Sequence, residues 1–369
     1  MRICYSLLAL VLLISCSSEK ESVSFFTSDL KDFVADTLFF EKDLETKALP
    51  LVFTYQKSGG KEMLSGMVGY KLLQYDYQTG DLMNSHSFEK EGPNGIGGFI
   101  SGNLVTEEGI FFISDQKQLI YSDFDGQIKD RLPLPQVPDE RLAVNFSTMR
   151  GNPMAYDKEI RTLMAADVPF VLKEPNMQYE DWVWQFDWEK RESMPVKFSY
   201  PEKYREYYDD IELGVYAHTY SPGLKTHVVS FPVSDSLLVI DSEEKRWVSS
   251  KSTSEMTFQK GVVQEFDGFT AFLPSEETSR YKWILHDPYR DLWLRYVNLE
   301  TKGEKDENRR NKSSFIVHDS NFQVMAELFF DNQQIAPEGF ATPDGFFFKL
   351  LNPASDDVEV YVRVIFDFW

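Results

Sequence analysis

Residues 358–368 read VEVYVRVIFDF, the clearest β-strand pattern in the chain. Successive residues of a strand point to opposite faces of a sheet, so alternation places four valines and two phenylalanines on one apolar face. A turn at Asn352-Pro353-Ala354 separates this strand from the apolar residues 346–351. The C-terminus is therefore predicted to be a β-hairpin of residues 346–351 and 359–368.

Five similar hairpins precede this one, each with two short strands joined by a tight polar turn. They comprise residues 72–77 with 82–88, 119–124 with 127–132, 182–188 with 193–198, 237–241 with 246–250, and 315–319 with 322–329. Six such units over about 340 residues give a mean period of about 57 residues, roughly what four short strands and their turns occupy. We therefore predict an all-β fold, a six-bladed β-propeller of four-stranded antiparallel blades. A pair of β-sandwiches is the alternative with the same strand content.

The ends of the chain are predicted to meet in the last blade. Residues 37–41 (TLFFE) supply an N-terminal outer strand that closes the ring. Residues 157–166 and 202–209, each near a proline, are predicted to be short helices. The strongly charged residues 300–312 are predicted to be a solvated loop.

The N-terminus reads as an export signal that ends at a lipidation site. Met1-Arg2 begins a mostly apolar stretch, and Leu13-Ile14-Ser15-Cys16 matches a lipobox. The stretch is shorter than the roughly 20 residues of a membrane-spanning helix. We expect a signal peptide at residues 1–15, acylated Cys16 with a flexible tether at residues 16–32, and a single propeller domain at residues 33–369. A plain secretory signal with a chance cysteine is the alternative.

Acyl chains on Cys16 would hold the protein at a membrane, because two or more chains bind a bilayer stably. Ser17 follows the cysteine, where an aspartate would indicate retention in the inner membrane. We therefore expect a lipid anchor in the bacterial outer membrane. The other cysteine, Cys4, lies within the predicted signal, so we expect no disulfide and no reactive thiol in the mature chain.

The chain is acidic, with 59 Asp and Glu against 38 Lys and Arg and a net charge of −21 at pH 7. Nucleic-acid binding needs a basic surface, so nucleic acid is excluded from the expected partners. The expected partners are the membrane, through Cys16, and a protein, peptide or glycan. No cofactor is expected.

The most suggestive polar cluster surrounds the sequence HDPYR at residues 286–290. The candidate ligand-binding residues are His286, Asp287, Tyr289, Arg290, Arg295 and Tyr296. An acid, a phenol and a guanidinium on a loop stiffened by Pro288 could hold a carboxylate or a sugar hydroxyl group. In the structural alternative, Asp287 caps the turn and Arg290 bridges two blades.

Trp182, Trp184 and Trp188 alternate along one predicted strand, with Phe186 on the same face. They form a candidate aromatic platform on which sugar rings could stack. The alternative is packing between adjacent blades, where large flat side chains fill a wedge-shaped space.

Motifs for metal binding or catalysis are weak. The five histidines show no short spacing typical of metal-ligand pairs, and no G-x-S-x-G nucleophile elbow is present. We therefore predict no metal site and no catalytic residue.

Four segments resemble an uncharacterised family of bacterial lipoproteins, domain-of-unknown-function family 4221. They are residues 91–97 (EGPNGIG), 230–235 (SFPVSD), 286–290 (HDPYR) and 338–351. The resemblance implies a six-bladed propeller of the TolB type behind a lipobox. It implies no activity.

These observations favour a lipid-anchored propeller of the cell envelope that acts as a binding or scaffold module. An enzyme is the competing class, most plausibly a propeller hydrolase or lyase acting on a polysaccharide. A purely structural partner in a larger outer-membrane complex is a third possibility.

Overall fold

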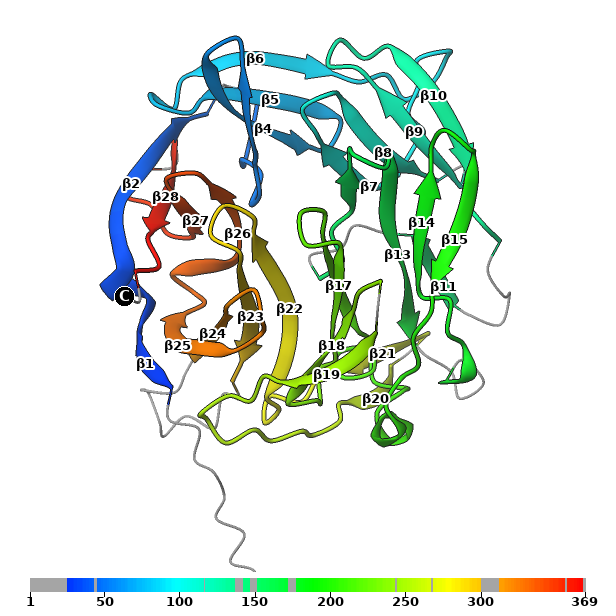
Figure 1. Cartoon of the computed structure of the whole chain (residues 1–369), viewed down its shortest axis with the longest axis vertical. Coiled ribbons are helices and arrows are strands. Elements are labelled where there is room, and N and C mark those ends of the chain that lie inside the picture. The colour runs from blue at the N-terminus through cyan, green and yellow to red at the C-terminus, as the bar shows by residue number, and fades with distance from the viewer. Residues whose placement is uncertain are drawn as a thin grey trace, which may run out of the picture.

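The computed structural model describes residues 25–42, 45–115, 117–136, 142–146, 151–171, 177–242, 244–266, 268–299, 312–355 and 357–367. Six small sheets surround a central channel, and each sheet is antiparallel apart from one added parallel strand (Figure 1). The prediction of a six-bladed β-propeller is confirmed.

The first three blades follow one another along the chain. Blade 1 contains β3 (Thr54–Ser58), β4 (Lys61–Val68), β5 (Lys71–Asp76) and β6 (Leu82–Ser87), and blade 2 contains β7 (Ile100–Val105), β8 (Ile110–Ser114), β9 (Gln118–Ser122) and β10 (Ile128–Pro133). Blade 3 contains β11 (Leu142–Phe146), β12 (Ala155–Asp157), β13 (Thr162–Val171), β14 (Val183–Asp187) and β15 (Glu192–Val196). Both β11 and β12 pair with β13, so the innermost strand of blade 3 is split in two.

The remaining blades complete the ring. Blade 4 contains β16 (Ala217–Ser221), β17 (Thr226–Ser230), β18 (Ser236–Ile240) and β19 (Lys245–Ser249), and blade 5 contains β22 (Arg280–Asp287), β23 (Leu292–Asn298), β24 (Lys312–His318) and β25 (Val324–Asp331). Blade 6 contains β26 (Ile335–Thr342), β27 (Gly345–Leu350), β28 (Val358–Val364) and the N-terminal β2 (Val34–Glu41). A separate hairpin, β20 (Val262–Phe266) with β21 (Phe269–Leu273), lies in the connection between blades 4 and 5.

The predicted closure of the ring is confirmed. Strand β2 pairs antiparallel with β28, and Phe40 lies opposite Glu359. The ring of Phe40 is fully buried and contacts Phe53, Tyr75 and Tyr361. The N-terminal strand therefore joins blade 6 to blade 1 through aromatic packing as well as through the sheet.

An additional strand precedes the closing strand. Strand β1 (Phe26–Asp29) runs parallel to β25, with Phe26 opposite Ala326, and a 3-10 helix, η2 (Leu30–Phe33), leads from it to β2. This strand lies within residues 16–32, which we expect to be a flexible tether, so the paired part of the chain begins by residue 26. Residues 1–24, including Cys16, lie outside the described residues.

All six predicted hairpins are present, but the helix predicted at residues 157–166 is wrong. Strands β12 and β13 form a hairpin there, and its turn places Arg161 at φ 49°. Leu163, Met164 and Ala165 are all buried. The sheet lies between two neighbouring blades, so both faces of the strand are apolar and no period-2 pattern is visible in the sequence. Residues 202–209 contain the 3-10 helix η4 (Glu202–Glu206), and residues 300–311 lie outside the described residues.

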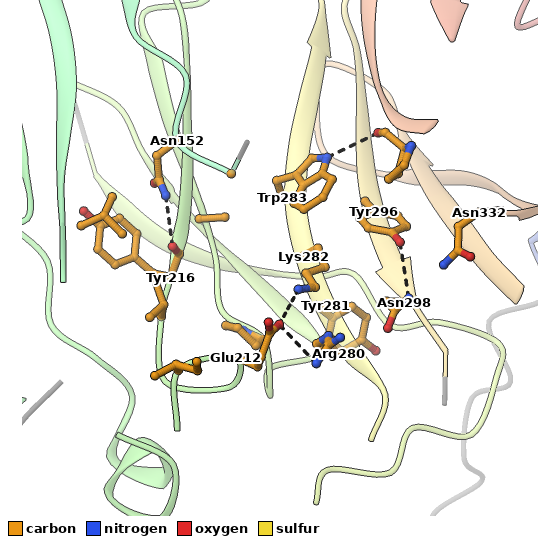
Figure 2. A pocket seen from close by; sticks show the side chains of 17 residues that line it. Asn152, Glu212, Tyr216, Arg280, Tyr281, Lys282, Trp283, Tyr296, Asn298 and Asn332 are labelled. Carbon is orange, nitrogen blue, oxygen red and sulfur yellow. Dashed lines mark hydrogen bonds and ion pairs between the residues drawn. The ribbon is translucent and has the colours of Figure 1, made fainter. Parts of the chain in front are cut away.

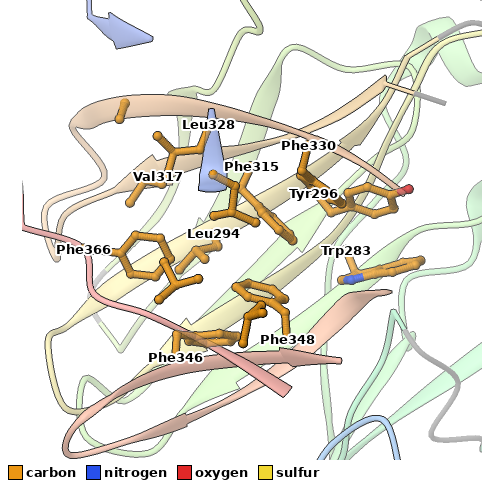
Figure 3. Packing of buried hydrophobic residues seen from close by; sticks show 14 of the residues in the cluster. Trp283, Leu294, Tyr296, Phe315, Val317, Leu328, Phe330, Phe346, Phe348 and Phe366 are labelled. Carbon is orange, nitrogen blue, oxygen red and sulfur yellow. The ribbon is translucent and has the colours of Figure 1, made fainter. Parts of the chain in front are cut away.

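Aromatic side chains fill the wedge between blades 5 and 6 (Figure 3). The rings of Phe315 and Phe348, from different blades, lie 5.0 Å apart, and Phe330 stacks on Phe315 at 4.7 Å. Such contacts hold neighbouring sheets together without hydrogen bonds between their strands.

The two faces of the ring differ in their connections. The upper face, as we call it, carries the connections between blades and the turns between the second and third strands of each blade. The lower face carries the other hairpin turns. Innermost strands run from the upper to the lower face, so the first residues of β16 and β22 lie at the upper face.

Candidate functional site

Two cavities occupy the central channel. The lower cavity has a volume of about 660 Å³ and is lined by residues of all six blades, including Tyr55, Tyr156 and Tyr289. The upper cavity has a volume of about 650 Å³ and is lined mainly from blades 3 to 6. Both volumes are within the range of small-molecule sites in proteins.

A short segment at the split inner strand of blade 3 contributes to both cavities. Gly151 and Asn152 line the upper cavity, whereas Pro153 and Met154 line the lower one. Gly151 packs closely here, since an added Cβ atom would lie 3.2 Å from the Cβ atom of Ala217. Residues 151–154, which precede β12, therefore border both cavities.

Three charged side chains meet in the upper cavity (Figure 2). Lys282 Nζ lies 2.7 Å and Arg280 Nη1 lies 3.2 Å from the same oxygen, Oε2 of Glu212. Burial alone raises the pKa of the Glu212 carboxyl, but Lys282 and Arg280 outweigh this effect and hold the pKa below its usual range. The carboxylate is therefore ionised at neutral pH.

The two cations come from a strand and the acid from a connection. Arg280 and Lys282 are two residues apart at the start of β22, where the strand is irregular between Tyr281 and Ile284, and both side chains reach Oε2 of Glu212. Glu212 lies in the connection between blades 3 and 4, where Asp210 Oδ1 accepts hydrogen bonds from the backbone N–H groups of Glu212 and Leu213, each at 2.8 Å. Asp210 Oδ2 accepts a further bond from the Gly261 N–H. The buried Asp210 thus fixes the loop that carries Glu212.

Amide side chains line other parts of the same cavity. Asn332 Nδ2 donates to Ser313 Oγ at 3.0 Å, and Asn298 Nδ2 lies 3.4 Å from the hydroxyl oxygen of Tyr296. Asn152 Nδ2 lies 3.4 Å from the backbone oxygen of Tyr216, and Asn152 Oδ1 is buried without a hydrogen-bond partner among the described residues. The lining therefore offers several hydrogen-bonding groups around the ion pairs.

An indole supplies the aromatic part of this lining. Trp283 lies beside Tyr296, with 4.7 Å between ring centroids, and its Nε1 is 3.4 Å from the backbone oxygen of Pro337. The upper cavity thus combines charged, amide and aromatic groups, which is the composition of a site for a polar ligand.

The structure gives two of the predicted site residues structural contacts. Asp287 is fully buried, and its Oδ1 accepts backbone hydrogen bonds from Tyr289 and Arg290. Arg290 Nε lies 2.8 Å from Asp287 Oδ2, and its terminal nitrogens donate to the backbone oxygens of Thr342 and Pro343 in blade 6. These are the contacts of the structural alternative, a capped turn and a bridge between blades.

Arg295 also joins two blades. Its fully buried guanidinium donates from Nε to Ser230 Oγ at 3.0 Å and from Nη1 to the Ser250 backbone oxygen at 2.9 Å. Nη2 donates to the backbone oxygens of Phe231 and Ser234. Every one of these acceptors belongs to blade 4 or its connections, whereas Arg295 belongs to blade 5.

The other members of the predicted cluster are divided between the two cavities. His286 and the half-exposed Tyr289 line the lower cavity, whereas the buried Tyr296 lines the upper one. The six residues therefore do not form one cluster around a single site.

The three tryptophans of the predicted platform pack against other aromatic side chains. Trp182 is fully buried beside Tyr200 and Tyr216. Trp184 and Trp188 are half-buried and pack in the cluster that joins blades 2 and 3, where Trp188 lies 5.3 Å from Phe111. Trp182 in particular has no surface on which an external sugar ring could stack.

Glu212, Arg280 and Lys282 were not predicted as site residues. The spacing of Arg280 and Lys282 at the start of a strand was the available signal, since alternation in a regular strand places two such cations on one face. Nothing in the sequence indicates that Glu212, nearly seventy residues earlier in the chain, lies opposite them.

In the described parts of the chain, no group of three or more His, Cys, Asp and Glu side chains is placed to hold a metal ion. No helix among the same residues is long and apolar enough to cross a membrane.

Comparisons with known proteins confirm the family resemblance. The family model described as Domain of unknown function (DUF4221) matches residues 22–328. A crystal structure of a DUF4221 family member from Bacteroides vulgatus ATCC 8482 is similar over 90% of this chain and 97% of that chain, with a TM-score of 0.72 and 19% sequence identity. No curated protein matches the chain.

A second crystal structure is that of a protein from Bacteroides fragilis NCTC 9343 named as a candidate exported protein. It is similar over 92% of this chain and 99% of that chain, with a TM-score of 0.52 and 11% sequence identity. At such low identities, both likenesses establish the fold alone.

Proposed function

The chain belongs to the DUF4221 family, and from this premise we propose that it is a lipid-anchored protein of the bacterial cell envelope that binds a polar ligand in its upper cavity. The observation that carries this proposal is the meeting of Glu212, Arg280 and Lys282 with aromatic and amide side chains in one cavity. These ion pairs are partly exposed, and such pairs are a weak source of stability, because solvent screening and partial desolvation offset much of the attraction. Binding of a polar ligand would explain why three charged side chains meet in this cavity.

The proposed envelope location has separate support. The lipobox around Cys16 supports a lipid anchor in the outer membrane, and one structural neighbour is named as a candidate exported protein. Export would bring the propeller into contact with envelope polymers and proteins. A glycan or a peptide is therefore the expected class of ligand.

Ligand-observed NMR with the full chain tests the binding role. The probes are neutral and acidic sugars together with short neutral and acidic peptides. The doubly substituted variant Asn298→Ala/Asn332→Ala changes the upper cavity, and Tyr289→Ala changes the lower cavity as a matched control. We expect the first variant to weaken binding of at least one probe and the second to leave it unchanged.

Two results would contradict the proposal. One is the absence of binding by every probe at millimolar concentration. The other is loss of binding on Tyr289→Ala alone, which would move the site to the lower cavity. Unchanged melting temperatures in both variants are required for either comparison.

A further inference from the structure

The charge of the upper cavity is opposite to that of the chain. The protein carries a net charge of −21, yet among the described residues those with charge that line this cavity are two cations and one acid, Arg280, Lys282 and Glu212. The lining therefore has one net positive charge. Potentials inside a cavity of low dielectric are stronger than at the open surface, so this local charge favours an anion.

Glu212 interacts with both cations, and this leaves N–H groups of Arg280 without a hydrogen-bond acceptor among the described residues. Both cations contact the same oxygen of Glu212. Nε of Arg280 is buried and has no hydrogen-bond partner among the described residues, and the contact of Nη1 with Glu212 does not have hydrogen-bond geometry. A guanidinium binds a carboxylate best through two parallel N–H groups, an arrangement that Glu212 does not provide.

We propose that the upper cavity selects a carboxylate-bearing sugar, such as a uronic acid, and that Glu212 occupies the carboxylate position until the ligand replaces it at Arg280 and Lys282. This inference rests on the proposed function and specifies the ligand of the same site. Glu212 is itself a carboxylate, so its contacts show which chemical group the two cations accept.

The remainder of the lining favours a sugar over an acidic peptide. Asn298, Asn332 and Asn152 place amide groups around the cavity, and amides exchange hydrogen bonds with hydroxyl groups in both directions. The indole of Trp283, which packs in the cluster between blades 5 and 6 and is 9% exposed, contributes the part of its aromatic surface that reaches the lining. The backbone of an acidic peptide could pair with the same amide groups, so the indole of Trp283 is the feature that favours a sugar ring.

The elements that carry the charges make such an exchange possible. Arg280 and Lys282 belong to β22 in the wall of the channel, whereas Glu212 belongs to a connection. Asp210 holds the backbone of that connection, so the side chain of Glu212 can turn away without unfolding the loop. Its carboxylate then competes with the ligand for the same two cations.

Two substitutions test this competition, one that removes the negative charge of Glu212 and one that removes the positive charge of Lys282. The probes are sodium D-glucuronate and its neutral counterpart D-glucose, titrated into the full chain and followed by NMR. Glu212→Gln removes the competing charge and keeps the side-chain shape, so it should tighten glucuronate binding by about fivefold. Lys282→Met should weaken it by about tenfold. Neither change should alter the affinity for glucose by more than about twofold.

A second pair of variants keeps the test independent of folding. Arg280→Gln should act in the same direction as Lys282→Met, and Lys129→Met, which removes a cation outside this cavity, should leave both affinities unchanged. Melting temperatures identify any variant that is not folded, and the other variants then decide the outcome.

The possible results are distinct. Weaker glucuronate binding in Glu212→Gln overturns the competition, because it would make Glu212 a direct ligand contact. Equal affinities for glucuronate and glucose overturn acid selectivity while the proposed binding function stands. Tighter binding of a glutamate dipeptide than of glucuronate overturns the assignment to sugars. Binding of no probe by any folded variant overturns the inference and the proposed function together.

Discussion

Arg295 and Tyr281 form a fully buried cation–π pair, with the guanidinium carbon 3.9 Å from the ring centroid. No acid is needed to hold this charge, because its nitrogens donate to four acceptors of blade 4 and its connections. Burial lowers the pKa of Arg295 to about 10, so the side chain stays protonated at neutral pH. The hydrogen bonds of this cation therefore join blade 5 to blade 4, while the ring of Tyr281, in the same blade as Arg295, covers the guanidinium.

Arg295→Lys should destabilise the protein by about 3 kcal/mol, because an ammonium cannot reach acceptors spread along the plane of a guanidinium. Urea denaturation measures the change. Arg246→Lys is the matched control, since Arg246 forms surface ion pairs with Asp241 and Glu244, and its effect should stay within about 0.5 kcal/mol. Equal losses of stability in the two variants would contradict the role of Arg295 in joining blades 4 and 5.

Phe40→Ala should cost about 3–5 kcal/mol, because it removes a buried ring from the junction of blades 6 and 1. Phe39→Ala is a control from the same strand, where the neighbouring side chain is 56% exposed, and it should change the stability little. Thermal unfolding of both variants checks the comparison. Deletion of residues 37–41 should lower the melting temperature of the whole ring further, and an unchanged value would count against closure as a source of stability.

The stability should fall as the pH drops from about 6.5 to 4.5. Burial lowers the pKa of His227 and His286 to about 4, that of His318 to about 3, and that of His218 well below its usual value. In the unfolded chain these histidines bind protons near pH 6.5, so the unfolded state binds more protons in this window and acid favours unfolding. The midpoint of urea denaturation, measured at several pH values, reports the slope.

His318→Leu should make this pH dependence shallower, because it removes one of the four groups from the window. The variant need not be more stable at pH 7, since only the slope matters. A midpoint that stays constant between pH 7 and 4.5 in the wild-type protein would show that buried histidines do not control the acid limit.

Cys16→Ala should release the protein from membranes, because it removes the proposed site of acylation. Fractionation of cells, followed by a carbonate wash of the membrane pellet, measures the distribution. Ser17→Ala is the control and should leave the protein in the pellet. Retention of the Cys16→Ala variant after the wash would refute anchoring through this residue alone.

The fold was largely predictable because its signals are local. A hairpin such as β27–β28 can be predicted from the alternation of apolar and polar residues and from a Pro-containing turn, all within about twenty residues. Strand β13 escaped prediction because both of its faces are buried, as Leu163 and Met164 show. Strand β1 escaped because its pairing with β25 joins residues about three hundred positions apart.

The candidate site was predictable only in part, because it depends on contacts between distant segments. The sequence HDPYR attracted attention as a group, yet the structure uses Asp287 and Arg290 to hold a turn and a blade contact. Glu212 and Lys282 meet although seventy residues separate them. The contact between Glu212 and Lys282 depends on how the blades close into a ring, and no local sequence pattern predicts it.

The position of β1 fixes the face of the propeller at which the described chain begins. Phe26 pairs near the beginning of β25, at the lower face, so residues that precede it join the propeller at the face with the hairpin turns. The cavity that contains Glu212 opens at the opposite end. A ligand could therefore enter the upper cavity at the face away from this attachment point, whereas Tyr289 lies at the same face as the start of β1.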